Sequence, residues 1–369
     1  MRVTYSMMVK NMEYWTSKQL EKLNNAQTIV ASGKRINKPS DDPEAAGQIL
    51  ADRTTISKYG QYELNISQAQ TWIKESDTTL STVNTLLQNA KDILSSLTSA
   101  NSTTSAGELS SIYGEVINYA NTWSGSGYMY SGNESTVKPF ANDVKVSGGA
   151  PSEIVFDLAG TASDVTIKIT DSTGTVVRTL TAASGVEGTN TITWDGCDDS
   201  GNTLTDGNYS FTISASNDSG DAVAAYSTYR GDEGGKEVVA GESSTVVLNN
   251  SGGEIFSNAL KVLSQAITAL NSSDTGSTAI SNLSASLTDA ISQIQAEEAT
   301  LSNKNSLLEN STSRLTELTL YVNNRISDTE TGDTTTSATE LQAQTTAYET
   351  TMSATASVLK MSTLKDYLA

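Results

Sequence analysis

The fold of this chain is decided by residues 66–94, ISQAQTWIKESDTTLSTVNTLLQNAKDIL, in which an apolar residue returns at every seventh position. The same spacing returns late in the chain. The positions are Ile66, Ile73, Leu80, Leu87 and Leu94, then Ile280, Leu287, Ile294, Leu301, Leu308, Leu315 and Val322. A strict seven-residue repeat keeps one face of a helix turned toward a partner helix, as a coiled coil requires. The pattern therefore predicts a mainly α fold in which the N- and C-terminal halves form a long antiparallel helical rod.

Composition agrees with long helices. The 369 residues favour about two or three domains, and a hydrophobic share of 37% with only 6% aromatics is low for one globular core. Helices that bury a single stripe have such a composition. The formal net charge of −19 opposes binding to phosphate backbones, so we expect no nucleic-acid partner.

Residues that carry chemistry are scarce. The chain has no histidine and one cysteine, Cys197, which removes the commonest general base and any intrachain disulfide. The acidic run from Asp195 to Asp206 does not fit a calcium loop, because Cys197 and Ser200 stand where an oxygen ligand and a glycine are needed. We therefore predict no catalysis, no cofactor and no metal.

Targeting signals are also missing from the sequence. Residues 1–15 lack the uninterrupted apolar core of a cleaved signal peptide. No run approaches the ~20 apolar residues of a membrane span. We expect no membrane partner, and either a cytoplasmic protein or one exported without a cleaved leader.

Local signals place the first helices. A helical pattern covers residues 5–31 and ends at Gly33, and Asp42 before Pro43 is a strong helix start. This second helix is expected to reach about Leu97. A break at 99–104 and a shorter helix over about 108–123 follow.

The last third of the chain is expected to be helical again. Helices resume near Gly253 and break at 272–276, and the long return helix ends near Asp328. A polar linker over 329–336 and a last amphipathic helix to the C-terminus complete the prediction.

The middle of the chain has a two-residue period. Val165, Ile167 and Ile169 alternate with polar residues, as do the residues around Trp194 and Phe211. Short alternating runs between Gly, Asp and Asn clusters predict a small antiparallel sandwich over 151–222, with Trp194 in its core. Eleven acidic and only two basic residues in this segment would keep it solvated on the outside of an assembly.

Several motifs resemble a known superfamily. Residues 32–43, SGKRINKPSDDP, resemble the N-terminal signature of bacterial flagellins. Residues 127–140 with their GYMYSGN and PF motifs, 229–256, and the ending at 359–368 are similar, in the same order, to the family of hook–filament junction proteins (hook-associated protein 3). Tyr128, Met129 and Tyr130 are expected to pack locally.

The middle segment has a resemblance of its own. VRTL at 177–180, WDG at 194–196 and DGNY at 206–209 are similar to the immunoglobulin-like repeat of flagellar hook-capping proteins. The repeat would be inserted into the junction protein's small β domain, splitting it into 140–150 and 223–250. The remaining expected domains are terminal helices over 1–40 and 335–369, ordered on assembly into the inner tube, and a rod over 41–139 and 251–334.

The resemblance implies a function. The chain would be a structural subunit of the bacterial flagellum, extracellular, forming a homo-oligomeric ring that adapts the hook to the filament. Its partners would be the hook-side junction protein, flagellin and, before secretion, an export chaperone. The subunit-interface residues would be Lys34, Arg35, Asn37, Leu359, Leu364, Tyr367 and Leu368.

Alternatives stay open at this point. The seven-residue repeat alone fits any two-stranded stalk, and flagellin itself shares the end motifs. A surface-displayed adhesive or glycan-binding module would rest on the acidic sandwich. The basic loop with Lys34, Arg35 and Lys38 is either a solvated turn or a contact with carboxylates of adjacent subunits.

Overall fold

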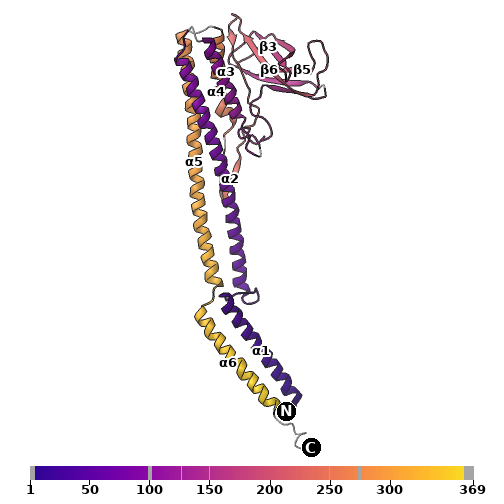
Figure 1. Cartoon of the computed structure of the whole chain (residues 1–369), viewed down its shortest axis with the longest axis vertical. Helices are drawn as coiled ribbons and strands as arrows, with labels where there is room; N and C mark the ends of the chain where they lie inside the picture. Colours follow the sequence, from indigo (N-terminus) through magenta and orange to yellow (C-terminus); the bar gives the residue numbers. More distant parts are fainter. Residues whose placement is uncertain are drawn as a thin grey trace, which may run out of the picture. The chain divides into compact units, whose positions relative to one another are not determined.

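The structure, a computed structural model, describes residues 5–98, 102–125, 127–148, 150–248, 250–272 and 276–360. It divides into two compact units, to which the long helices α2 (Pro43–Ser95) and α5 (Ser277–Glu330) both contribute (Figure 1). The terminal unit consists of Met1–Glu63 and Ser313–Ala369, and the central unit of Leu64–Thr312. Each unit is described by itself below.

Helices α1 (Tyr5–Ser32) and α6 (Thr334–Leu359) lie side by side in the terminal unit (Figure 1). Gly33 ends α1 as predicted, with a φ of 67° and an N–H that donates to the Ile29 carbonyl at 2.9 Å. Pro43 is the first residue of α2, and Asp42 Oδ1 accepts a hydrogen bond from the Ala45 N–H at 3.1 Å. The predicted start of the second helix is confirmed.

The polar linker predicted over 329–336 is shorter in the structure, where residues 331–333 separate the two helices. Helix α5 runs to Glu330, and α6 begins at Thr334 behind the N-cap Asp333, whose Oδ1 accepts from the Thr335 N–H at 2.9 Å. Polar residues favour helix caps as much as loops, because their side chains satisfy the free amides of a first turn. The same reason explains why α3 (Ser102–Ala120) includes Thr103 and Thr104, which were expected to break a helix.

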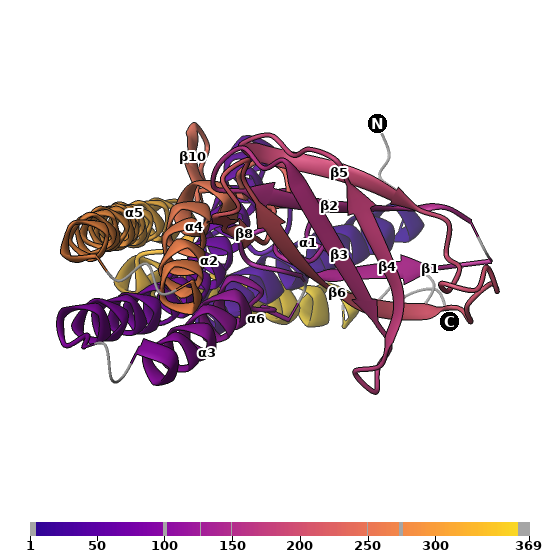
Figure 2. The ribbon, with the colours of Figure 1, turned by 90° about the horizontal axis from the view of Figure 1, so that it is seen from above.

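The seven-residue repeat is the core of the central unit. Ile66, Ile73, Leu80, Leu87 and Leu94 of α2 are buried, as are Leu287, Ile294, Leu301 and Leu308 of α5. Asn84 Nδ2 lies 3.4 Å from Glu298 Oε2 across the two helices. Helix α3 packs on α4 (Gly252–Asn271), and Figure 2 shows these four helices end on.

Two antiparallel sheets form the sandwich in the central unit (Figure 2). The first contains β1 (Asp143–Val146), β6 (Gly207–Ser216), β3 (Asp164–Thr170) and β4 (Val176–Ala182), with β7 (Ala222–Val223) paired to the end of β6. The second contains β5 (Gly188–Trp194), β2 (Ser152–Leu158) and β8 (Ala225–Tyr226). Trp194 is fully buried between them and its Nε1 donates to the Cys197 carbonyl at 3.0 Å, as its predicted core position required.

Strand pairing extends the sandwich beyond 151–222. Strand β1 pairs with β6 through Val144 and Tyr209, and β8 pairs with β2 through Tyr226 and Asp157. Both strands had been assigned to the small β domain. Only β9 (Glu237–Gly241) and β10 (Ser244–Val247) form a separate two-stranded sheet among the described strands.

Three hairpin turns of the sandwich share one design. Each begins with Asp or Asn, has glycine three residues later with φ near 82°, and covers 171–175, 198–202 and 217–221. The first side chain accepts hydrogen bonds from two backbone amides, at 2.8 and 2.9 Å for Asp171, 2.8 Å twice for Asp198, and 2.9 Å twice for Asn217. A left-handed conformation at this position favours glycine, and the side-chain bonds replace missing backbone partners.

These turns make the sandwich sensitive to acid. Hydrogen bonds from the Thr173 hydroxyl and from Asn202 hold the pKa of Asp171 and of Asp198 below their ordinary values. A lowered folded pKa adds stability above the unfolded pKa, and this is lost as pH falls through the folded value. Asp171→Asn with Asp198→Asn should therefore flatten the acid limb of the stability curve while the turns persist, since Asn217 already serves one of them.

Urea unfolding at pH 7 and at pH 3 measures this change. Asp218→Asn is the matched control, because its side chain makes no hydrogen bond with the described residues. An unaltered pH dependence in the double variant would contradict the assignment.

A second set of contacts ties the sandwich to the helices. We call Tyr130, Gly132, Tyr229 and Asp232 the tyrosine node. The Tyr229 hydroxyl lies 2.9 Å from the Tyr130 carbonyl and 2.8 Å from the Asp232 carbonyl, and Asp232 Oδ1 accepts from the Asn133 N–H at 2.6 Å. Tyr130 is buried edge-on against Phe256 of α4, as its expected packing role required.

Loss of the Tyr229 hydroxyl should destabilise the central unit. Tyr229→Phe leaves buried carbonyls with one partner fewer, which costs about 1 kcal/mol. Gly132→Ala should cost more, because glycine adopts a φ of 73° there and a Cβ would overlap Asp232. Thermal unfolding followed by near-UV circular dichroism reports both, with Tyr128→Phe as the control whose hydroxyl has no partner among the described residues.

Candidate assembly interface

The two chain connections of the terminal unit are bonded to each other. The Arg35 N–H donates to the Glu330 carbonyl at 2.7 Å, and the Gly332 N–H donates to the Gly33 carbonyl at 3.1 Å. Ile36 lies between them, buried against Ile49, Val322 and Ile326. The signature loop after α1 is therefore fixed on α2 and α5.

Two predicted interface residues already have partners within the chain. Glu330 Oε1 lies 2.9 Å from Lys34 Nζ and 3.0 Å from Arg53 Nη2. Arg35 Nη1 lies 3.2 Å from Asp42 Oδ2, and the pKa of Asp42 is lowered by the Ala45 amide and by Arg35. Both basic side chains are still about half exposed, at 46% and 52%, so they keep donors for a neighbouring carboxylate.

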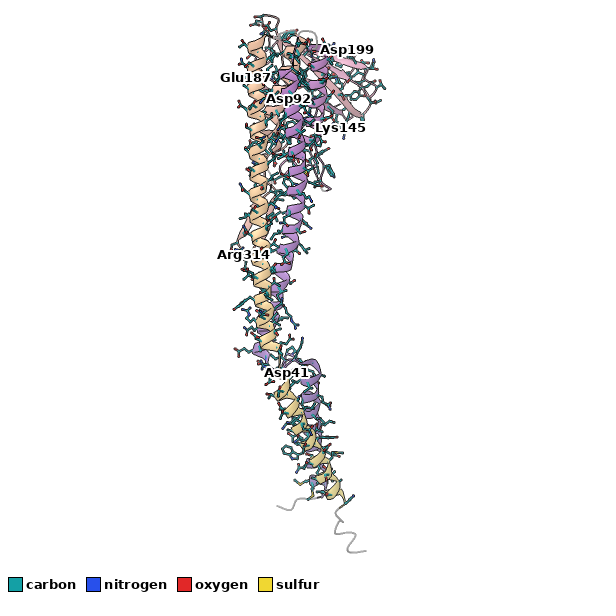
Figure 3. The ribbon with its side chains drawn as sticks, turned by 60° about the vertical axis from the view of Figure 1, so that its left-hand side comes forward. Asp41, Asp92, Lys145, Glu187, Asp199 and Arg314 are labelled. Atoms are coloured by element: carbon teal, nitrogen blue, oxygen red, sulfur yellow. The ribbon has the colours of Figure 1, made fainter. Side chains whose placement is uncertain are left out.

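The third predicted residue of the loop, Asn37, shapes the turn. Its Nδ2 donates to the Lys34 carbonyl at 2.8 Å, and its N–H donates to Asp41 Oδ2 at 3.0 Å. Asp41, labelled in Figure 3, also accepts from the Lys38 N–H at 2.8 Å. The Lys38 side chain is exposed and forms no ion pair with any residue the structure describes. An interface role for this loop remains a prediction.

An ion pair between a buried aspartate and a partly exposed arginine joins α2 to α5 in the terminal unit. Asp52 on α2 is only 4% exposed at its side chain, and its Oδ2 accepts from Arg325 Nε on α5 at 2.8 Å, with a second bond between Oδ1 and Nη2. The bond to Asp52 holds the pKa of Arg325 above its ordinary value. This two-bond geometry fixes the register of α2 against α5 within the terminal unit.

Helices α1 and α6 bury very little. In the described part of α1 only Leu23 and Ala26 are buried, and no side chain described in α6 is. Tyr14 is 57% exposed and Trp15 60%, and the two rings contact each other edge to face. A groove of about 460 Å³ between α1 and α6, away from these two rings, is lined by residues that include Val9, Met12, Leu20 and Thr355.

Sequence reasoning missed these exposed aromatic residues as interface candidates. Tyr14 and Trp15 stood in a weak helical pattern, and no periodic signal separates an apolar stripe that packs within the chain from one that awaits a partner. Of the predicted tail residues, Leu359 is the last residue of α6. Leu364, Tyr367 and Leu368 lie outside the described residues.

Other potential sites carry no comparable geometry. Asp195 and Asp206 of the sandwich serve its backbone, since Asp195 accepts from the Cys197 N–H and Asp206 from the Gly148 N–H. Across the described residues, no three His, Cys, Asp or Glu side chains are grouped to hold a metal. None of the described helices combines the length and the apolar character that crossing a membrane needs.

Comparison with known protein families identifies two regions. Residues 3–133 match the bacterial flagellin N-terminal helical region, and residues 141–219 match the FlgD Ig-like domain. The chain carries a flagellin-type helical region and a FlgD-type immunoglobulin-like domain. The second match begins before β1, in agreement with the strand pairing that extends the sandwich.

Relatives of known name agree with both regions. The chain is 30% identical to flagellar hook-associated protein 3 of Escherichia coli over 156 residues, which cover 40% of this chain and 49% of that protein. It is 35% identical to the basal-body rod modification protein FlgD of Salmonella typhimurium over 120 residues, 31% of this chain and 51% of that one. The chain thus spans about half the length of the curated relatives it matches. The resemblance seen in the sequence is confirmed.

A solved structure shares the fold. A putative flagellar hook-associated protein from Vibrio parahaemolyticus is 16% identical, with a TM-score of 0.51 over 79% of this chain and 100% of that one. At this identity the likeness concerns architecture alone. It supports a mainly helical fold with β inserts.

Little buried area predicts early cleavage of the terminal helices. Brief digestion of the monomer should remove about the first 40 and last 35 residues, because helices that bury so little apolar surface open readily. Mass spectrometry of the products locates the cuts. Equal resistance throughout the chain would contradict this expectation.

Proposed function

We propose that this chain is a structural subunit of the bacterial flagellum at the junction between hook and filament. It works by shape and carries no catalysis. The proposal is supported by the match to hook-associated protein 3 and by the flagellin-type region over residues 3–133.

One observation carries the proposal. The α1–α6 pair presents Trp15, Tyr14, Met7 and Met8 to solvent on one face of α1, and buries almost nothing in the described residues. Burying a large apolar side chain contributes about 1.5–3 kcal/mol. Neighbouring copies that cover this face would supply the area that the isolated pair lacks. The terminal helices then belong to the assembled inner tube and the sandwich faces outward.

The exposed apolar face of α1 also accounts for the proposed partners. A ring of copies has two ends, one against the hook-side junction protein and one against flagellin, so it can match a different surface on each side. Before export, an export chaperone covers the apolar face, which would otherwise promote aggregation. The acidic sandwich repels its equivalents and keeps the outside soluble.

Flagellin itself is the second candidate, since residues 3–133 match its N-terminal region. Immunogold labelling of intact flagella separates the two. A single labelled band at the hook end supports the junction subunit, and label along the filament supports flagellin. Absence of label from flagella would overturn both candidates.

Deletion of the sandwich tests a third candidate, a displayed adhesive module. Loss of surface binding with motility intact would favour it.

A charge on the exposed face should block assembly without unfolding the monomer. Trp15→Glu places a carboxylate where a neighbour must pack, so labelled junctions should be lost while helicity is retained. Val186→Glu is the matched control, because Val186 is equally exposed, at 61%, but lies in the sandwich. Normal junctions with Trp15→Glu would show that this face is not covered.

A further inference from the structure

Helix α5 has an outward stripe in the terminal unit. Glu317, Leu320, Tyr321 and Asp328 recur at helical spacing on the face opposite the buried Val322 and Ile326. Leu320 is 62% and Tyr321 63% exposed. Neither acidic residue forms an ion pair with the described residues. The stripe is therefore apolar at its centre and negatively charged at both ends.

Helix α2 of the same unit borders a cleft whose lining includes two basic side chains. A cleft of about 390 Å³ is lined by Pro39, Pro43, Gly47 and Leu50 among others, with Leu50 68% exposed. Lys38 and Arg53 also line it, together with Glu330 at the end of α5. Lys38 has no ionic partner among the described residues, and Arg53 shares Glu330 with Lys34. Arg53 keeps further N–H donors.

The two surfaces have similar lengths. At 1.5 Å per helical residue, Glu317 and Asp328 lie about 16 Å apart along α5. Along α2, Pro43, which lines the cleft together with Lys38, lies about 15 Å from Arg53. Both surfaces belong to one chain, but Leu50 and Tyr321 are each more than 60% exposed, so the chain itself covers neither of them. Apolar centres with charges of opposite sign at matched spacing are the pattern of a protein–protein contact.

We infer that the outward stripe of α5 in one copy packs into the α2 cleft of the next copy. Leu320 and Tyr321 would cover Leu50. Copies in a ring point the same way, so α5 of one copy runs antiparallel to α2 of its neighbour, which places Glu317 opposite Arg53 and Asp328 opposite Lys38. Because stripe and cleft differ, the contact is head-to-tail and closes into a ring by rotation. The inference rests on the proposed function, for which it names the lateral contact.

Cysteine cross-linking tests the geometry. In a Cys197→Ser background, copies with Leu50→Cys and copies with Tyr321→Cys are co-expressed, and isolated flagella are treated with a short bismaleimide. The mixture should give cross-linked dimers and the double variant a ladder, while each single variant gives neither. Dimers from Leu50→Cys alone would indicate a two-fold contact and overturn the inference.

Charge exchange tests the specificity. Lys38→Asp or Asp328→Lys should each reduce labelled junctions about tenfold through like-charge repulsion. The double variant should restore them, because the pair is rebuilt between copies. Lys168→Asp, an exposed change of equal charge in the sandwich, is the control. Unfolding midpoints should stay unchanged, since neither residue has an ionic partner within the described chain.

Failure of this contact and failure of the proposed function give different results. Label at the hook end without cross-links or charge rescue overturns only the lateral contact. Absence of label from the flagellum overturns the function itself.

Discussion

The seven-residue seam between α2 and α5 is the interaction on which the central unit depends. Leucine and isoleucine from both ends of the sequence meet there, among them Leu80, Leu87, Leu287 and Ile294. Each such side chain contributes about 1.5–3 kcal/mol when it leaves water. Chain segments far apart in sequence are thereby brought together, and the tyrosine node and the sandwich are built on this support.

The terminal unit is packed much less completely than the central unit. Its α2–α5 part is fixed by a small core around Ile36 and by the Asp52–Arg325 pair, whereas α1 and α6 bury almost nothing. Ordering a helix costs conformational entropy that burial must offset. In the function proposed above, contacts from other chains would offset this cost, and the ends would complete their folding on assembly.

The sequence predicted the helices, the sandwich and its buried Trp194, because each leaves a periodic pattern of apolar residues. Boundaries were less certain, since Ser102 and Asp333 read equally well as breakers and as helix starts. Strands β1 and β8 were assigned to the small β domain but pair within the sandwich. The sequence of a short strand does not identify the strand with which it pairs. The exposure of Trp15, Leu50 and Tyr321, on which the proposed contacts rest, was not predicted, because the sequence alone does not distinguish an exposed apolar residue from a buried one.

The chain enters and leaves the sandwich through two segments that lie side by side. The Arg230 N–H donates to the Pro139 carbonyl at 2.8 Å, and Phe140 forms a bridge with Tyr229. The two ends of the inserted module therefore sit about one strand spacing, ~5 Å, apart. Another compact domain whose termini are neighbours could be inserted here, provided that it replaces the contacts with α4, such as the 3.0 Å ion pair of Lys261 with Glu187. Exchange of such domains between proteins of different function then requires only one insertion site in the chain.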